Sequence, residues 1–421
     1  MVTAIMSSHD SILVINCGSS SVQFALFSGD VALERRLYGE VDGVGSPSGR
    51  MRMTASGDQS PIDTALVACD HKAALSTILE SFKSRLAKAH ILAVDHRVVH
   101  GGEDCDCPVP VTADLEARLL ELVPLAPLHS PHNLAGIAAI RGMHPDRVQI
   151  ACFNTAFHHA LPPLARMYAL PRELQQAGIR HFGFHGLSYE YVVEALRRRS
   201  VDLERERIIV AHLGNGASMC ALRSGRSVET TMGFSTLAGL MMGTRSGDLD
   251  PGAVLYLLTK KGMSPADIQA LLYQRSGLLG VSRSSSDMRE LLAHQDDAAV
   301  REAVDLFCYR ARRYLAALTA ALGGLDRVVF TGGVGANAPE VRKRICAGLN
   351  YLGITLDDTA NGASAATISA RHAAVAVEVP ASDEELMIAQ HVLRLSDYAT
   401  AITGEIVHVD AGFNIEGMVF H

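Results

Sequence analysis

Tryptophan is absent from this chain of 421 residues, and aromatic side chains make up only 5% of it. The interior must therefore be built mainly from aliphatic side chains, which suits helices packed in layers on sheets. A surplus of positive charge is also missing, since the formal net charge is -7 at pH 7. Proteins that bind nucleic acid broadly carry a basic surface. We therefore expect no nucleic-acid partner, although local basic pockets for small anions remain compatible with this charge.

The chain also lacks the usual marks of a secreted, zinc-stabilised or membrane protein. No CxxC pair occurs among the eight cysteines, and the CxC of Cys105 and Cys107 is too little for a structural zinc site. The opening residues MVTAIMSSHD have neither the basic nor the long apolar region of a secretory signal. No apolar run reaches the length of about 18–20 residues that a membrane span needs. We expect reduced thiols in a cytoplasmic protein with no membrane partner.

One plan of strands and turns occurs twice in the sequence. Each copy has an apolar strand, a glycine-bearing loop, a second strand, a tight turn and a third strand. The strands are SILVIN (11–16), VQFALF (22–27) and VALERRLYGEV (31–41) in the first copy, and RIIVAH (207–212), SMCALR (218–223) and SVETT (227–231) in the second. Helical stretches such as 71–90 and 187–199 lie between them. The repeat predicts a duplicated α/β domain.

The glycine loops of the two copies, NCGSSS at 16–21 and HLGNG at 212–216, suggest a function. Glycine lets a ligand approach the backbone closely, and the amide groups of such a loop present positive dipole ends to a phosphate. Two ordinary hairpins with glycine turns would give a similar sequence. The repeat alone therefore leaves a phosphate-binding pair and a purely structural pair of loops open.

A third glycine cluster, GGVGAN at 332–337, lies late in the chain and is expected to form a turn. The surrounding elements are expected to be strands at 326–331 and 373–380 and helices at 339–349 and 382–396. The pattern Gly333-x-Gly335-x-x-Ala338 after a strand also fits a loose dinucleotide-binding fingerprint. Too little chain follows it for the rest of such a domain, so we disfavour a dehydrogenase.

Three short stretches gather arginine and histidine among glycines: DHRVVHGGE (95–103), RHFGFHGLSYEY (180–191) and LMMGTRSGDLDPG (240–252). A planar guanidinium binds a phosphate or a carboxylate through two parallel hydrogen bonds. Phosphoryl transfer depends mainly on positioning and on neutralising the charge around the migrating group. Two arginines, a histidine donor and Mg²⁺ would therefore be a sufficient set of groups for that chemistry.

Taken in order, the motifs of this chain resemble those of the acetate kinase family, in the superfamily of acetate and sugar kinases that includes actin and hexokinase. The resemblance runs from about residue 11 to about residue 396, through NCGSSS, HRVVHGGE, NTAFH, FGFHG, HLGNGAS, MGFSTLAGLMMGTRSGDLDPG, SSDMRE, FTGGVGAN and SDEEL. It implies an α/β fold of two ribonuclease-H-like (actin-like ATPase) domains, with mixed sheets flanked by helices and a cleft between them. The two glycine loops would meet the ATP phosphates from opposite sides.

The resemblance also predicts the domain organisation. The N-terminal actin-like domain would cover 1–160 and be joined by the C-terminal helix 382–396, and the C-terminal nucleotide-binding domain would cover 161–381. Residues 397–421 would form an atypical tail, in which ITGEIVHVDAGFNIEGM at 402–418 resembles the C-terminal end of enoyl-acyl-carrier-protein reductases. The rest of such a reductase is absent, so we expect no reductase activity. We expect a partly apolar appendage whose removal leaves kinase kinetics intact.

The activity implied is reversible transfer of a phosphoryl group from ATP to acetate, giving acetyl phosphate and ADP by direct in-line displacement. Mg²⁺ is the expected metal and Mn²⁺ the alternative. Propionate is the alternative acceptor, because one methylene in a pocket lined by Val99 is worth only about 1–3 kcal/mol. Family members are homodimers, so the resemblance implies a homodimer as well.

Positions that match the family's functional residues can be assigned roles. Arg97 would hold the carboxylate end of acetate or acetyl phosphate, Arg245 would stabilise the transition state, and His185 would donate to the migrating phosphoryl group. Asn16 and Glu384 would arrange the metal. The methyl pocket would be lined by Val99, Leu128 and Phe184. The nucleotide would be bound by Gln23, His212, Leu213, Gly214, Asn215, Gly216, Asp287, Met288, Arg289, Gly333, Val334, Gly335, Ala336 and Asn337.

The sequence departs from the family pattern at three functional positions, one of them the catalytic position Asn154. Asn154 stands where the family has a catalytic aspartate, Gln23 where lysine is common, and Ala336 where glutamate is common. Acetate is already ionised at pH 7, so no base has to remove a proton from it. The amide oxygen of Asn154 can still orient a metal-bound water, without the negative charge that Mg²⁺ prefers. We predict a working but weakened kinase, and the alternative is a nucleotide-binding homologue that has lost catalysis through Asn154 and Gln23.

Overall fold

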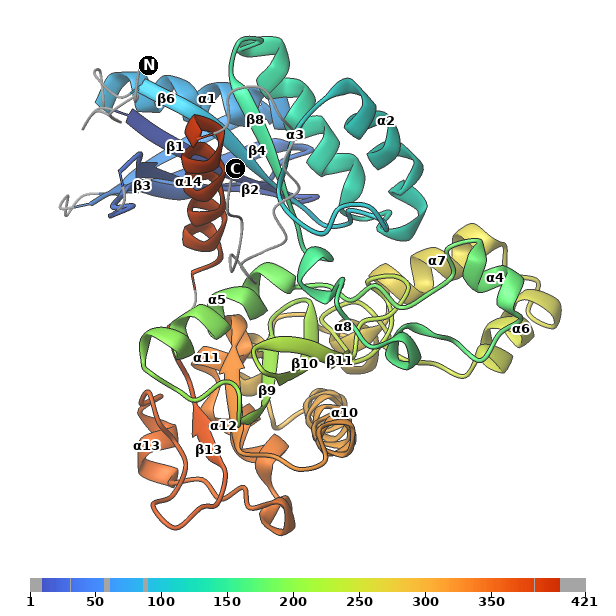
Figure 1. The fold of residues 1–421 in the computed structure, drawn as a ribbon. Helices are drawn as coiled ribbons and strands as arrows, with labels where there is room; N and C mark the ends of the chain where they lie inside the picture. Colours follow the sequence, from blue (N-terminus) through green and yellow to red (C-terminus); the bar gives the residue numbers. More distant parts are fainter. Residues whose placement is uncertain (1–9, 31, 57–60, 86–89, 382, 402–421) are drawn as a thin grey trace. The chain divides into compact units, whose positions relative to one another are not determined.

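The computed structural model describes residues 10–30, 32–56, 61–85, 90–381 and 383–401. They form two compact units, each with its own sheet and helices (Figure 1). The first unit runs to Ala156 and takes up the chain again from Glu384, and the second unit is Phe157–Asp383. The predicted α/β class is confirmed, because both units combine a mixed sheet with flanking helices.

In the first unit the described residues form a sheet of eight strands in the order β5-β4-β3-β2-β1-β6-β8-β7. The strands are β1 (Asp10–Cys17), β2 (Ser21–Ser28), β3 (Arg35–Asp42), β4 (Ser46–Ala55), β5 (Ile62–Cys69), β6 (His90–Val98), β7 (Val109–Pro110) and β8 (Val148–Phe153). The helices are α1 (His71–Arg85), α2 (Ala113–Glu121), α3 (Ser130–Met143), α14 (Glu384–Ala401) and the 3₁₀ helix η1 (Val123–Leu125). Strands β1 to β5 are antiparallel neighbours, whereas β1, β6 and β8 run parallel to one another.

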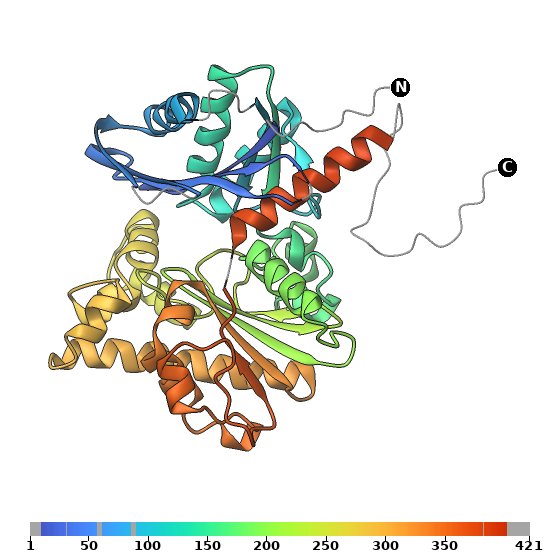
Figure 2. The ribbon, with the colours of Figure 1, turned by 90° about the vertical axis from the view of Figure 1, so that its left-hand side faces the viewer.

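Helices cover both faces of the central strands of this sheet. Leu13, Ile15 and Val94 point to one face, where they pack in a buried core with α1 and α3. Helix α14 packs across β1, β2, β6 and β8 (Figure 2). Side chains alternate between the two faces of a strand, so Arg97, three residues after Val94 on β6, points to the opposite face. There its guanidinium contacts Glu384 of α14. Burial on both faces explains the continuous apolar run of β1.

In the second unit the described residues form a sheet of five strands in the order β11-β10-β9-β12-β13. The strands are β9 (Arg207–Leu213), β10 (Ala217–Arg223), β11 (Arg226–Thr230), β12 (Arg327–Thr331) and β13 (Ala376–Glu378). The α-helices are α4 (Arg172–Gln176), α5 (Gly186–Arg198), α6 (Pro251–Thr259), α7 (Pro265–Gln274), α8 (Gly277–Ser282), α9 (Met288–Ala293), α10 (Ala298–Leu322), α11 (Gly332–Asn337), α12 (Pro339–Cys346) and α13 (Asp358–Gly362). The short 3₁₀ helices are η2 (Ala156–His158), whose first residue is the last of the opening segment of the first unit, and η3 (Pro163–Arg166) and η4 (Asn350–Leu352).

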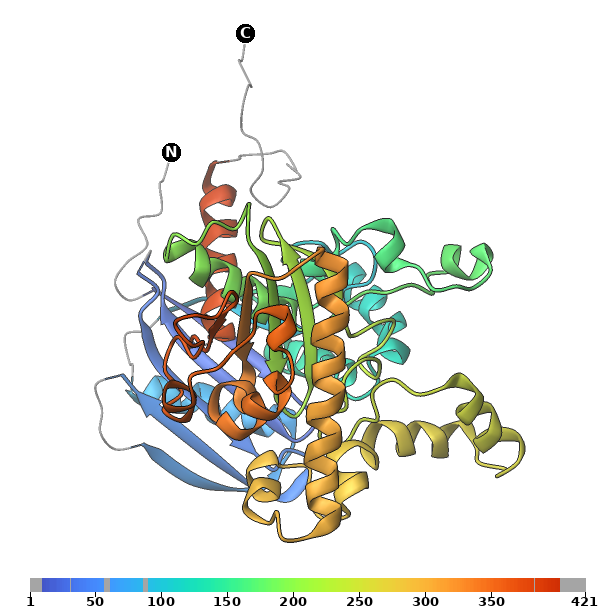
Figure 3. The same cartoon turned by 90° about the horizontal axis from the view of Figure 1, so that it is seen from below.

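Two helices make the main layers on this second sheet. Helix α5 buries Tyr189, Val192 and Leu196 against the apolar side chains of β9 and β10. The long helix α10 packs on β9, β10 and β11 (Figure 3). Its ends are well defined, because the Asp297 carboxylate accepts hydrogen bonds from the first turn and Gly323 ends the helix with φ of 70°.

The two units share one strand plan, as the sequence repeat predicts. The order β3-β2-β1-β6-β8 of the first unit corresponds in position and direction to β11-β10-β9-β12-β13 of the second. The loops after the first strands correspond as well. Gly18 N donates to Ser21 O at 2.8 Å, and Gly214 N donates to Gly216 O at 3.0 Å. Each loop is thus a tight glycine turn at the carboxyl end of a strand.

The prediction of a turn at GGVGAN was wrong, because these residues form helix α11. The sharp change of direction is confined to Gly332, whose φ is 76°. The helix then closes because the buried Arg342 guanidinium donates to the carbonyl oxygens of Gly335 and Ala336, both at 2.8 Å. Arg342 lies on α12, so only the tertiary structure supplies this support.

Several element boundaries also differ from the predictions. The strand expected at 31–41 begins at Arg35, where its pairing with Phe27 of β2 starts, and the helix expected at 339–349 ends at Cys346. The helix expected at 71–90 ends at Arg85. His90 instead begins strand β6, because residues 90–98 pair with β1 on one side and with β8 on the other. The strand expected at 373–380 is reduced to Ala376–Glu378. Residues 397–401 continue α14 instead of starting a tail. The rest of the predicted appendage, 402–421, lies outside the described residues.

All eight cysteines are thiols, and seven of them are buried. Within the described ranges, no helix combines the length and the apolar character that a membrane crossing requires.

Candidate active site

In the first unit, three of the predicted residues surround the Arg97 side chain. Arg97 Nη1 donates to Asn16 Oδ1 at 3.4 Å, and Arg97 Nε donates to Asn154 Oδ1 at 3.4 Å. The same Nε lies 3.5 Å from Glu384 Oε2. The residues meet because β1, β6 and β8 are parallel neighbours whose carboxyl ends lie at one edge of the sheet, where α14 begins. The exposed fractions of the Arg97 and Glu384 side chains are 18% and 23%, so water screens this ion pair only partly.

Gln23 contributes to this cluster through Asn16. The two residues are cross-strand partners in β1 and β2, and Asn16 Nδ2 donates to Gln23 Oε1 at 3.0 Å. With its NH₂ group engaged by Gln23, Asn16 presents its oxygen to Arg97. The four side chains thus form one chain of hydrogen bonds, Gln23–Asn16–Arg97–Asn154.

The donor atoms of this cluster suit a small divalent cation. The side chains of Asn16, Asn154 and Glu384 offer two amide oxygens and one carboxylate around a single guanidinium. Mg²⁺ prefers oxygen ligands, and it is often bound by one or two carboxylates together with water and substrate phosphates. The residues present therefore fit Mg²⁺, with Glu384 as the acidic ligand.

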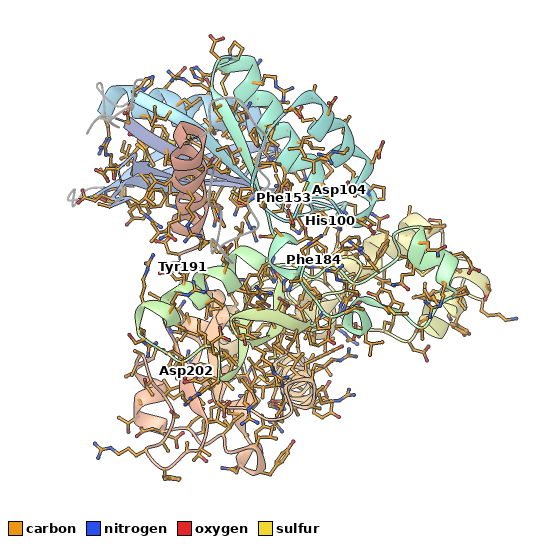
Figure 4. All side chains as sticks on the ribbon, viewed as in Figure 1. His100, Asp104, Phe153, Phe184, Tyr191 and Asp202 are labelled. Carbon is orange, nitrogen blue, oxygen red and sulfur yellow. The ribbon has the colours of Figure 1, made fainter. Side chains whose placement is uncertain are left out.

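Two residues of the predicted methyl pocket also belong to the first unit. Val99 follows β6 and is 6% exposed, and its N–H donates to Asn133 Oδ1 at 3.0 Å. Asn133 Nδ2 donates in turn to Cys17 O at 2.9 Å, so Asn133 fixes the ends of β1 and β6 together. Leu128 is half-buried just before α3. Phe184, the third residue, belongs to the second unit, where it precedes α5 (Figure 4).

In the second unit, the glycine turn 212–216 lies directly beside the start of α11. Strands β9 and β12 are parallel partners, with Thr331 opposite His212. A Cβ built on Gly332 would lie 2.6 Å from the carbonyl oxygen of Leu213, so only glycine fits there. The backbone amides of both segments are therefore gathered at the carboxyl edge of the sheet, an arrangement that suits a phosphate chain.

The predicted groups Arg245 and His185 converge on this glycine turn. A Cβ built on Gly216 would lie 2.6 Å from Arg245 Nη2 and 3.3 Å from His185 Nε2. The other terminal nitrogen of Arg245 donates to Thr236 O at 2.6 Å. Burial lowers the pKa of Arg245 to about 10, so the guanidinium stays charged at neutral pH. A cation and an imidazole nitrogen thus face the same point above the backbone of Gly216.

The segment that carries Phe184 and His185 is held by a buried histidine. His158 is 1% exposed, and its Nε2 lies 2.9 Å from the carbonyl oxygen of Phe184. A carbonyl can only accept, so His158 Nε2 carries the hydrogen and Nδ1 accepts from Ser227 Oγ at 2.8 Å. Burial lowers the pKa of His158 to about 4, which keeps this ring neutral at pH 7. The backbone before His185, whose own φ is 59°, is thereby fixed.

The residues predicted for the nucleoside lie at the starts of two helices. Asp287 caps α9, and its carboxylate accepts from the backbone N–H of Arg289 at 2.8 Å and from Arg289 Nη2 at 2.6 Å. These hydrogen bonds from Arg289 lower the pKa of Asp287. Met288 is buried, whereas the Arg289 side chain is 89% exposed. In α11, Asn337 Nδ2 donates to Gly333 O at 3.0 Å and closes the helix on itself.

Sequence reasoning missed four residues that support these groups: His158, Tyr189, Ser218 and Arg342. All four are buried and polar. His158 and Arg342 hydrogen-bond the backbone of Phe184 and Gly335, Ser218 hydrogen-bonds the His185 ring, and Tyr189 hydrogen-bonds Ser218. Ser218 carried a signal, because a lone hydroxyl in the apolar strand ASMCALR needs a buried partner. His158 and Tyr189 lie in the stretches NTAFH and RHFGFHGLSYEY, which gave neither of them a role of its own, and Arg342 lies outside all the motifs.

The fold and the two sets of site residues place the chain in the actin-like ATPase class of α/β proteins. The sequence profile of the acetokinase family matches residues 11–390. An acetate kinase of Rhodopseudomonas palustris (strain TIE-1) is 48% identical over 394 residues, which is 92% of this chain and 99% of that protein. The crystal structure of Porphyromonas gingivalis acetate kinase is 36% identical, with a TM-score of 0.81 over 92% of this chain and 100% of that one.

A propionate kinase from Francisella tularensis is also similar, with 36% identity and a TM-score of 0.84 over 91% of this chain and 98% of the solved chain. The protein therefore belongs to the acetokinase family, and the resemblance expected from its motifs is confirmed.

Proposed function

We propose that the protein is an acetate kinase, which transfers the terminal phosphoryl group of ATP to acetate in a reversible, Mg²⁺-dependent reaction. The observation that carries the proposal is the convergence of Arg245 Nη2 and His185 Nε2 on the glycine turn at Gly216. Such a turn binds phosphate through its amides, and the two side chains supply positive charge and a hydrogen bond where a phosphoryl group would move.

The roles are distributed over both units. In the first unit, Arg97 binds the carboxylate of acetate, and Val99 and Leu128 contact its methyl group. In the second unit, Phe184 is the residue that the resemblance assigns to the same group. Asn16 and Glu384 would hold Mg²⁺, which when bound neutralises charge on the phosphates. In the second unit, the turn 212–216 and α11 bind the nucleotide phosphates.

The chemistry needs no general base on the acceptor side. A carboxylate is already the nucleophile at pH 7, so it attacks the phosphorus in line while the bond to ADP breaks. Arg97 orients the attacking oxygen. Arg245 and His185 then stabilise the charge spread over the phosphoryl oxygens in flight. Asn154 therefore does not need to be an acid or a base for the reaction to proceed.

The experiment is acetyl phosphate formation by the purified protein, trapped as the hydroxamate, with ATP, Mg²⁺ and acetate. We expect the wild type to form product and Arg97→Ala and Arg245→Ala each to lower kcat/KM by about 10³-fold or more, as for arginines that stabilise phosphoryl transfer. Arg205→Ala, which removes a guanidinium that is 89% exposed, is the matched control. Product formation at the parental rate by the double Arg97→Ala, Arg245→Ala variant would contradict the proposal. A wild type that binds ATP but forms no product would instead be the inactive homologue.

Propionate is the second candidate acceptor, favoured by the similarity to a solved propionate kinase. A pocket lined by Val99, which is 6% exposed, would suit a methyl group better than an ethyl group. One methylene changes the binding free energy by only about 1–3 kcal/mol, so we expect discrimination within about 200-fold. Running acetate and propionate in parallel and comparing kcat/KM decides which acid is preferred.

We further propose a cytoplasmic homodimer. The location agrees with eight unoxidised thiols and with ATP as substrate. The dimer is supported by helix α6, which carries the apolar run AVLYLL and yet has no residue buried by the described part of the chain. Leu255 and Tyr256 on it are 60% and 54% exposed. A second copy of the chain would cover such a face.

A further inference from the structure

The His185 side chain ends a buried chain of hydrogen bonds. His185 Nδ1 lies 2.8 Å from Ser218 Oγ, and the Tyr189 hydroxyl bonds the same Oγ. Ser218 and Tyr189 are both 0% exposed, so water does not compete for these hydrogen bonds. The ring nitrogen of His185 that faces the interior is therefore held by a buried hydroxyl group.

The plane of the His185 ring is fixed as well. It stacks on the His212 ring with centroids 4.3 Å apart and planes 26° apart. His212 is the cross-strand partner of Ser218, and its Nδ1 lies 2.8 Å from Ser188 Oγ. With the plane and one nitrogen fixed, the position of the proton on the His185 ring decides whether Nε2 donates or accepts.

The acidity of the two hydroxyls favours one position. A phenol is a stronger proton donor than an aliphatic hydroxyl, which favours Tyr189 as the donor to Ser218 Oγ. Ser218 then directs its own hydrogen to Nδ1 of His185, which accepts. A neutral imidazole carries a single hydrogen, and here it must be on Nε2. Nε2 is the nitrogen that faces Gly216 beside Arg245 Nη2.

We propose that Tyr189 and Ser218 are positioning residues that set the Nε2–H tautomer of His185, so that this nitrogen donates a hydrogen bond to the migrating phosphoryl group. No proton is transferred, because the hydrogen stays on Nε2 throughout the reaction. The catalytic part of the inference rests on the proposed kinase activity. The tautomer itself is a property of the protein without substrate.

The tautomer is measured by ¹⁵N NMR of the full-length protein labelled at histidine, at a pH where the ring is neutral. Comparison with His185→Gln identifies the signals of this residue among the eighteen histidines. We expect the wild type to carry the hydrogen on Nε2, with Nδ1 shifted by an accepted hydrogen bond. Ser218→Ala should abolish that shift and give a mixture of the two tautomers. Tyr189→Phe should also give a mixture, because the Ser218 hydroxyl is still present but its direction is no longer fixed by Tyr189.

Ser81→Ala is the matched control, since it removes a serine hydrogen bond of the same 2.8 Å length on helix α1 of the first unit and should leave the His185 signals in place. A wild-type hydrogen on Nδ1, or an unchanged Nδ1 signal in both Ser218→Ala and Tyr189→Phe, overturns the proposal. The NMR signals report the tautomer even if the protein has no kinase activity. The activity assay therefore tests the proposed function, and the NMR experiment tests the tautomer, independently of each other.

Kinetics test the consequence for catalysis. We expect Ser218→Ala to lower kcat by about 10- to 100-fold, as substitutions behind a functional histidine commonly do, with KM for ATP and acetate little changed. Tyr189→Phe should have a smaller effect in the same direction. A merely structural role would raise KM or lower the thermal midpoint and leave the tautomer as it is. That outcome counts against the inference.

Discussion

Asn154 accepts a hydrogen bond from Arg97 Nε at 3.4 Å, and Glu384 is the acidic side chain on the same guanidinium. A carboxylate at position 154 would add a second negative oxygen ligand beside Asn16 and Glu384. Because Mg²⁺ binds charged oxygen ligands more tightly, we expect Asn154→Asp to lower the Mg²⁺ concentration for half-maximal activity by about 3- to 10-fold, equivalent to about 1 kcal/mol. Turnover should rise or stay equal.

The measurement is acetyl phosphate formation over a Mg²⁺ titration at fixed ATP and acetate. Asn350→Asp, which adds the same charge at an exposed position of the second unit, serves as the control. Identical Mg²⁺ curves for wild type and Asn154→Asp would exclude a metal-linked role for this position.

Asp95 lies on β6 two residues before Arg97, and it is completely buried. Among the described residues neither of its carboxyl oxygens has a hydrogen-bond partner. Burial raises the pKa of Asp95 well above its ordinary value. The unfolded chain releases this proton near its ordinary pKa of about 3.9, while the folded chain keeps it. The folded state binds more protons, so stability falls as pH rises from about 4 until the folded pKa is passed.

Replacing this group should remove that loss. We expect Asp95→Asn to be more stable than the wild type at pH 8 by about 1–3 kcal/mol and nearly equal to it at pH 4. Thermal unfolding followed by circular dichroism at several pH values measures the difference. Asp104→Asn, at a side chain that is 76% exposed, is the control. A parallel pH dependence in Asp95→Asn and wild type would show that Asp95 is ionised in the folded protein.

Helix α11 shows how an element of the site depends on a residue elsewhere. The Arg342 guanidinium donates to the carbonyls of Gly335 and Ala336, and also to the side chain and the carbonyl of Asn361, between 2.8 and 2.9 Å. Replacing it by methionine leaves these buried acceptors unsatisfied, at about 1–3 kcal/mol each. We expect Arg342→Met to lower the unfolding midpoint by at least about 6 °C, since each kcal/mol is worth about 2–4 °C in a unit of this size.

The same variant should raise KM for ATP more than it lowers kcat, because α11 would lose its anchor near the glycine turn at 212–216. Lys343→Met is the matched control, since Lys343 is the next residue on α12 and its side chain is 56% exposed. An Arg342→Met protein with wild-type stability and wild-type KM for ATP would mean that α11 is held by its own sequence.

The elements that the sequence predicts well are those decided by local chemistry. Strands β1 and β9 are apolar runs that end in glycine turns, and the repeated plan around them identified both sheets.

The parts that the sequence could not predict depend on distant residues. GGVGAN was predicted as a turn because glycine disfavours helices, and the buried Arg342 that reverses this preference lies on α12. The convergence of Arg245 and His185 on Gly216 joins three distant segments, and the resemblance supplied their roles without this geometry. The hydrogen bonds of Ser218 and Tyr189 could not be predicted either, because they too join segments that are distant in the sequence.

Helix α6 presents an apolar face that the described part of the chain leaves uncovered, with Leu255 and Tyr256 more than half exposed. Its apolar side chains contribute little to the core of the second unit, since none of its residues is buried by the described part of the chain. An apolar face of this kind is stable in water when another surface covers it. In a homodimer with two-fold symmetry, the same face of the second copy can supply that surface.

We therefore expect the wild type to elute at twice the 45.0 kDa of one chain in size-exclusion chromatography with light scattering. Leu255→Glu places a charge in the centre of the proposed contact and should weaken the dimer by at least about 30-fold, or about 2 kcal/mol, as at an interface hot spot. Tyr351→Glu, which changes a side chain that is 74% exposed on η4, is the control and should remain dimeric. A dimeric Leu255→Glu protein would move the interface away from α6, and a monomeric wild type would exclude the homodimer. Because the site residues lie on other elements, a monomeric Leu255→Glu variant that keeps its kinase activity would further show that each chain carries out the reaction by itself.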